Sequence, residues 1–346
     1  MKKIILSALK YLLFLAMGIG LFWLAIKGKD INEILEGFKD ANYAWIGLSV
    51  VFMIASHIIR AMRWNLLIRT LNFKPKTITT FYAVMIGYFV NLAVPRLGEI
   101  SRCGVLSKHD KVPVNSLFGT VIAERAFDVI TLFVIILITI FAQFRFLSTF
   151  IKTNIILPLE QKFSGNAVFI IAGAIFLLIM AFAAFYLYRI FKRKVVEHTI
   201  AFTIKNIIDG FIKGILTIKC VENKKLFLFY SVLMWLMYYL TIYIAFFAMK
   251  ATSGLQPIDA LTVLVIGSIG VLVPTPGGIG AYQFFVSLSL TALCKSKYHE
   301  FAIDTNQAFS FANLIYFTQW IMMIIVGGFS WIMLFLSQKR IKNETT

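Results

Sequence analysis

The sequence predicts an all-α, polytopic membrane helix bundle with six full spans plus two re-entrant or broken helical hairpins, which makes eight membrane segments. Two observations predict the class, and one predicts the hairpins. Hydrophobic residues make up 60% of the 346 positions, against roughly 45–50% in soluble domains. The mean hydropathy is +0.83. A short stretch rich in proline and glycine also occurs twice within apolar sequence.

Six apolar runs are long enough to cross a hydrocarbon core of about 30 Å. They lie at 4–26, 44–68, 114–142, 166–188, 226–249 and 304–336. Two further runs, at 79–94 and 258–273, are shorter and each is followed by proline. Their length favours hairpins that enter and leave the membrane by the same face.

The repeated stretch reads NLAVPRLGEISR at 91–102 and GVLVPTPGGIGAYQ at 270–283. Proline lacks a backbone donor and glycine tolerates positive φ, so both stretches should interrupt a helix. Paired interruptions at corresponding positions of two halves are typical of a transporter's binding site. The residues expected to form these breaks are Pro95 and Gly98 in the first copy, and Pro274, Pro276, Gly277, Gly278 and Gly280 in the second.

The distribution of basic residues favours this topology. With six spans and a cytoplasmic N-terminus, 24 Lys and Arg residues fall inside and nine outside, whereas eight full spans give 15 and 18. Cytoplasmic segments should carry the excess. Each half would contain three spans, and because three is an odd number the second half would lie inverted relative to the first. The halves, 1–165 and 166–346, would then form an inverted repeat within one membrane domain, 1–346. A basic amphipathic helix at about 192–222 is expected between them, either as a tether or as a site for lipid headgroups.

Charged residues inside the third long run need partners. Glu124, Arg125 and Asp128 would each cost about 2.5–3.5 kcal/mol if they faced lipid. The first hairpin offers charged residues spaced three apart, which a helix presents on one side; these are Arg96, Glu99 and Arg102. The charges form either a structural ion-pair network or part of an ion or headgroup pathway.

Other polar candidates lie close to these segments. Arg60 and Arg63, with Trp64, end the second span, where they either snorkel to the membrane surface or bind headgroups. Asn91 precedes the first break and could hold freed backbone groups. The second break carries no charged residue up to Gln283. Either its backbone amides supply positive potential, or its glycines allow helices to pack closely.

Several functions are disfavoured. The net charge of +18 comes from basic residues that flank apolar runs, which indicates membrane orientation and not nucleic acid binding. Cys103, Cys220 and Cys294 form no CxxC pair, and neither they nor the four histidines have metal-ligand spacing. We expect no metal and no cofactor. No catalytic constellation is evident, so we expect that the chain is not an enzyme.

The chain resembles the transmembrane region of lysylphosphatidylglycerol synthases, also known as the uncharacterised UPF0104 family. The resemblance rests on RAMRW at 60–64, PRLGEISR at 95–102, ERAFD at 124–128 and PTPGGIGAYQ at 274–283. In the multiple peptide resistance factors, a similar region is the flippase half. The resemblance implies a lipid-handling inner-membrane protein whose polar motifs include the arginines and acids named above. Gln283 departs from it, because the family commonly has glutamate there.

Lipid translocation is therefore the first hypothesis, with a phospholipid or polyprenyl-linked amphiphile as cargo. The alternatives are a membrane-embedded lipid-modifying enzyme or an accessory subunit of one. The expected partners are anionic or polyprenyl-phosphate lipids, and either a second copy of the chain or a separate lipid-modifying enzyme. The expected location is the bacterial inner membrane, with both termini cytoplasmic. Lacking the aminoacyl transferase domain of full synthases, the chain is not expected to make lysyl lipid alone.

Overall fold

The computed structural model describes residues 16–94, 97–144, 221–273, 275–297 and 303–344, with Ser148, Lys152, Ile156 and Leu157 as isolated positions. Within these ranges the chain is helical and has no strand, as the sequence predicts. After an apolar helix that includes Ala16–Ile26, the elements are α2 (Ile31–Lys39), α3 (Tyr43–Arg69), α4 (Thr77–Ala93), α5 (Leu97–Asp110), α6 (Val114–Ala142), α11 (Lys224–Phe246), α12 (Pro257–Leu272), η2 (Pro276–Gly278), α13 (Ala281–Lys297) and α14 (Thr305–Glu344).

Four of the described helices are long and apolar enough to cross a membrane: α3, α6, α11 and the Thr305–Ser337 part of α14. They confirm four of the six predicted long runs. The run at 4–26 is described only from Ala16 onward, and the run at 166–188 lies outside the described residues. Almost all of the amphipathic helix expected at 192–222 also lies outside them.

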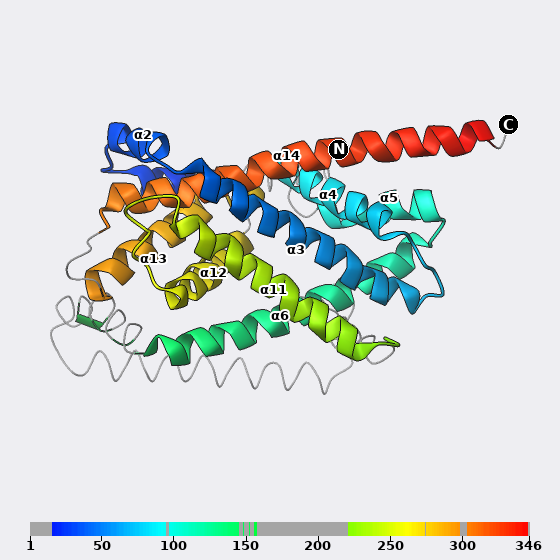
Figure 1. The fold of residues 1–346 in the computed structure, drawn as a ribbon, viewed down its shortest axis with the longest axis horizontal. Helices are drawn as coiled ribbons and strands as arrows, with labels where there is room; N and C mark the ends of the chain where they lie inside the picture. The colour runs from blue at the N-terminus through cyan, green and yellow to red at the C-terminus, as the bar shows by residue number, and fades with distance from the viewer. Residues whose placement is uncertain are drawn as a thin grey trace, which may run out of the picture.

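The two shorter apolar runs form α4 and α12, and each is followed by a second helix that packs back against it. With 17 and 16 residues, α4 and α12 are about 25 Å long at 1.5 Å per residue, less than the core thickness of about 30 Å. Figure 1 shows the α4–α5 and α12–α13 pairs toward opposite ends of the molecule, with α3 and α11 running between them. The long helix α14 packs against both α4 and α13.

Local sequence explains where these helices begin. The Asn42 side chain accepts a hydrogen bond from the Ala44 amide and caps α3, which satisfies one of the unpaired amides of a helix start. Helix α12 begins with Pro257 and with a reciprocal capping box between Gln256 and Asp259. Asp259 also accepts a hydrogen bond of 2.8 Å from Gln143, next to the end of α6. This contact ties α6 to the second hairpin.

The interior contains two large apolar clusters, one beside each hairpin. Trp64 and Phe227 are buried in the cluster beside α4 and α5, and Phe246 and Phe311 in the cluster beside α12 and α13. Large apolar side chains also cover the outer surface: Phe141, on α6, is 78% exposed. An apolar exterior on long apolar helices is what a lipid environment requires.

Candidate functional site

A buried ionic cluster lies where α3, α5 and α6 meet. Glu124 and Asp128 are one turn apart on α6. Glu124 accepts hydrogen bonds from Arg60 and, at 3.2 Å, from Arg102. Arg63 lies 2.7 Å from Asp128 and 3.5 Å from Glu124. Glu124 is therefore shared by three guanidinium groups on two helices.

Aromatic rings and hydroxyl groups support these arginines. The guanidinium of Arg102 lies 4.6 Å from the centre of the Trp64 ring, and the Trp64 indole donates to Thr120 at 2.9 Å. Cation–π contact stabilises a guanidinium that has left water. From α11, two further side chains accept hydrogen bonds: Tyr238 from Arg60 at 3.1 Å, and Ser231 from Arg63 at 3.3 Å.

Burial of the cluster is nearly complete. Glu124 and Arg63 are 0% exposed, and Arg102 is 3% exposed. Arg125 pairs with Glu99 of α5 at 2.7 Å, and their side chains are 41% and 38% exposed. The cluster thus has a buried centre and one accessible ion pair at its edge.

The first helix break lies directly beside this cluster. The Asn91 side chain accepts a hydrogen bond of 2.8 Å from the Gly98 amide, so it holds a backbone group freed by the break, as predicted. Gly98 packs so closely on α4 that a Cβ there would lie 2.0 Å from the Gly87 carbonyl oxygen. Pro95 and Arg96 lie outside the described residues, and the roles expected for them stay predictions.

The second break follows α12 and is uncharged. Gly277, Gly278 and Gly280 have φ of 58°, 83° and 79°, the left-handed conformation that favours glycine. The Tyr316 hydroxyl of α14 donates to the Gly277 carbonyl at 2.9 Å. Gln283 accepts a hydrogen bond of 2.8 Å from the Gly280 amide and is 1% exposed. Its amide oxygen therefore serves the backbone of the break. Pro274 lies outside the described residues.

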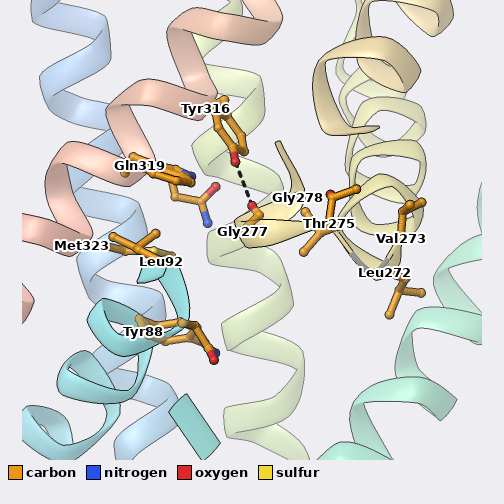
Figure 2. A pocket seen from close by; sticks show the side chains of 13 residues that line it. Tyr88, Leu92, Leu272, Val273, Thr275, Gly277, Gly278, Tyr316, Gln319 and Met323 are labelled. Carbon is orange, nitrogen blue, oxygen red and sulfur yellow. Dashed lines mark hydrogen bonds between the residues drawn. The ribbon is translucent and has the colours of Figure 1, made fainter. Parts of the chain in front are cut away.

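The two breaks share the wall of a cavity of about 240 Å³. Figure 2 shows side chains from α4, α12 and α14 gathered around the kink at Gly277 and Gly278. Asn91 and Leu92 come from the first break, Thr275 from the second, and Gln319 from α14. A much smaller hollow, lined by Arg102 and Arg125 among others, shares Tyr88 and Asn91 with this cavity.

The structure brings together most of the side chains expected to form a site. Arg60, Arg63, Arg102, Glu124 and Asp128 form the buried centre, with Glu99 and Arg125 at its edge and Asn91 beside it. Gln283 lies in the second break, apart from the described ion pairs. The sequence analysis missed Tyr88, Tyr238, Thr275, Gln319 and Trp320, because no periodicity distinguishes a polar or aromatic residue that faces a cavity from one that packs.

Trp64 shares a face of α3 with Arg60, but among the described residues the guanidinium over its ring is that of Arg102, from α5. Within the described ranges, no group of three or more His, Cys, Asp or Glu side chains could hold a metal ion.

These features define a multi-pass integral membrane protein with a buried arginine–carboxylate cluster between broken helices. The sequence profile described as the lysylphosphatidylglycerol synthase TM region matches residues 7–327. The chain belongs to this family.

Three curated proteins are similar over shorter stretches. The UPF0104 membrane protein MJ1595 of Methanocaldococcus jannaschii is 31% identical over 33% of this chain and 37% of its own length. The UPF0104 membrane protein PH1989 of Pyrococcus horikoshii is 27% identical over 37% of this chain and 39% of its own length. Glycosyltransferase AglD of Haloferax volcanii is 28% identical over 30% of this chain and 17% of its own length. No solved structure matches significantly.

Proposed function

We propose that this protein moves an anionic amphiphile, with a phosphate in its headgroup, between the two leaflets of a membrane. One observation carries the proposal. The ionic cluster holds four guanidinium groups, of Arg60, Arg63, Arg102 and Arg125, against three carboxylates, of Glu99, Glu124 and Asp128. Among the described residues the cluster therefore has a net charge of +1.

Unbalanced charge is costly in apolar surroundings, because water cannot solvate it. A phosphate group would neutralise the surplus, and the planar fork of arginine binds phosphate with two parallel hydrogen bonds. The anion would reach Arg125 first, because this guanidinium is the accessible one. Glu99, which is also accessible, would give up its ion pair in exchange. The surplus charge thus favours an anionic ligand over a neutral one.

Deeper passage requires the buried pairs to exchange. Glu124 contacts Arg60, Arg63 and Arg102 within 3.5 Å, so it can lose one partner and keep another. In the proposed cycle, headgroups bind Arg96 and Arg102 from the cytoplasmic side and the amides of the second break from the outside. Glu124 and Asp128 exchange partners as the halves rock against each other.

The proposed cycle needs two hairpins that enter from opposite membrane faces, as an inverted repeat of 1–165 and 166–346 would supply. The short lengths of α4 and α12 support it, and so does the cavity to which both breaks contribute. In the proposed topology both termini lie on the cytoplasmic side, and the membrane is a bacterial plasma membrane. Cysteines at Lys108 and Lys297 should then react with membrane-impermeant reagents from opposite sides, and reaction from the same side would contradict it.

The names of similar proteins add support from outside the structure. The family description refers to synthases of a lysylated phospholipid, and the name of AglD refers to glycosyl transfer. The similarity to AglD also favours a second candidate function, in which the protein is a lipid-modifying enzyme or an accessory subunit of such an enzyme. Its protein partner is then either that enzyme or a second copy of this chain. Product formation by purified protein supplied with lipid and an activated sugar would support that candidate.

The test of translocation uses purified protein in liposomes that contain fluorescently labelled lipids. Dithionite quenches label in the outer leaflet, so protein that moves lipid increases the fraction quenched. We expect faster quenching of an anionic phospholipid with wild-type protein, and loss of this effect in Arg102→Ala and Glu124→Gln. Arg69→Ala is the matched control, because Arg69 is exposed at the end of α3. Unchanged quenching for every lipid class would refute the proposal.

A milder variant avoids disruption of the buried centre. Glu99→Gln removes the carboxylate that competes with phosphate for Arg125, at a half-exposed position where ion pairs contribute little to stability. We expect Glu99→Gln to bind the anionic phospholipid more tightly than wild type. Weaker binding would contradict the proposed exchange.

A further inference from the structure

The cavity between the two breaks differs from the ionic cluster beside it, because its lining carries no charged side chain. Its volume is about 240 Å³, below the roughly 300 Å³ at which pockets for drug-sized ligands begin. It therefore suits a compact group and not a whole lipid. Aromatic residues dominate one side, with Tyr316 and Trp320 of α14 having ring centres 5.5 Å apart.

One polar atom in the lining has no hydrogen-bond partner within the described ranges, so a ligand could supply one. The Thr275 side chain is 4% exposed, and its hydroxyl has no hydrogen-bond partner among the described residues. Gln319 is partly buried and contributes an amide to the same lining. Buried hydroxyl and amide groups are normally hydrogen-bonded. A hydroxyl-bearing ligand would satisfy them, because each of its hydroxyl groups both donates and accepts.

The cavity also has features that disfavour an amine. Binding of an ammonium group in an apolar site calls for a carboxylate, and none lines this cavity. Aromatic faces attract cations, but the neighbouring cluster has a net charge of +1 and would repel one. An uncharged polar group therefore fits best.

Two residues connect the cavity to the ionic cluster. Tyr88 and Asn91 line both the cavity and the small hollow that Arg102 and Arg125 border. A phosphate at the arginines and a polar group in the cavity could thus belong to one molecule. We infer that the cavity binds the uncharged, polyhydroxylated part of a lipid headgroup, a cyclic polyol or sugar joined through the phosphate. This inference rests on the proposed function and specifies its substrate class.

The test measures binding of short-chain lipids to the purified full chain in detergent. Phosphatidylinositol carries a cyclic polyol, phosphatidic acid carries the phosphate alone, and phosphatidylethanolamine carries an amine. We expect phosphatidylinositol to bind about tenfold more tightly than either of the others, the effect of one or two hydrogen bonds. Soluble inositol phosphate, which lacks acyl chains, should bind much more weakly than the lipid.

Two variants assign this preference to the cavity. Thr275→Val and Gln319→Leu each remove one of its hydrogen-bonding groups with little change of volume, and should reduce phosphatidylinositol binding toward the level of phosphatidic acid. Thr318→Val is the matched control, since Thr318 hydrogen-bonds to the Leu314 carbonyl within its own helix and does not line the cavity.

Each outcome of the binding test has a clear meaning. Equal binding of the three lipids, retention of the preference in both variants, or equally tight binding of soluble inositol phosphate would overturn the inference. Transport without headgroup preference would overturn this inference and leave the proposed function standing. Headgroup preference without transport would overturn the proposed function and leave the inference about the cavity standing.

Discussion

Glu124→Gln provides the most quantitative test of the ionic cluster. The change keeps the shape of the side chain and removes the negative charge that Arg60, Arg63 and Arg102 share. Removing one partner of a buried ion pair costs about 3–5 kcal/mol, because the other charge is left uncompensated. We expect the free energy of unfolding to fall by about that amount. Titration with a denaturing detergent, followed by circular dichroism, measures it.

The accessible ion pair supplies the matched comparison. Glu99→Gln removes one charge from a pair that is about 40% exposed, and exposed pairs contribute only about 0–1 kcal/mol. The double variant Glu124→Gln with Arg102→Met removes one charge of each sign and should recover part of the loss. If Glu124→Gln cost no more than Glu99→Gln, the claim of an interdependent buried cluster would be refuted.

Two further predictions concern the hairpins. Gly98→Ala should destabilise the protein by about 1–3 kcal/mol, since its Cβ would lie 2.0 Å from the Gly87 carbonyl oxygen. Gly104→Ala, on the same helix with no neighbour within 4 Å, should be neutral or slightly stabilising in the same unfolding assay. Equal effects of the two variants would contradict the close packing of Gly98. Gln143→Leu should lower the free energy of unfolding by about 1–3 kcal/mol, because it removes a buried hydrogen bond to Asp259. Amide hydrogen exchange should become faster at the start of α12. Unchanged exchange there would contradict the role of this bond in holding α12 against α6.

The helices could be predicted because their signals are local. Runs of apolar residues predict α3, α6, α11 and α14 closely, and proline with glycine predicts the ends of α4 and α12. The sequence also indicates that Glu124 needs buried partners, because a charge within an apolar run cannot face lipid. The structure agrees, with Glu124 at 0% exposure.

The partners of Glu124 were only partly predictable. Arg102 follows from the helical spacing of the first hairpin, whereas the sequence left Arg60 and Arg63 open between snorkelling to the membrane surface and binding headgroups. Their role depends on how α3 packs on α6, which no local pattern encodes. The topology prediction does not depend on these residues: without Arg60, Arg63 and Arg102, the expected cytoplasmic count falls from 24 to 21, still well above nine.

The paired breaks indicated where a binding site would lie, but the side chains that line the cavity could not be predicted. Asn91, Thr275 and Gln319 are separated by long stretches of sequence and meet only because both breaks lie against α14. Polar residues within apolar helices also satisfy themselves locally, as Thr318 does with the Leu314 carbonyl. Sequence alone does not distinguish that role from a binding role.

Mass spectrometry of the intact protein with its retained lipids tests the central claim most directly, namely that the surplus positive charge is neutralised by a phosphate-bearing lipid. Purified wild-type protein should retain an anionic phospholipid in preference to phosphatidylcholine. Arg125→Gln, which brings the net charge of the cluster to zero, should lose that preference, whereas Arg69→Ala should keep it. Equal retention of anionic and zwitterionic lipids by wild type, or an undiminished preference in Arg125→Gln, would contradict the account.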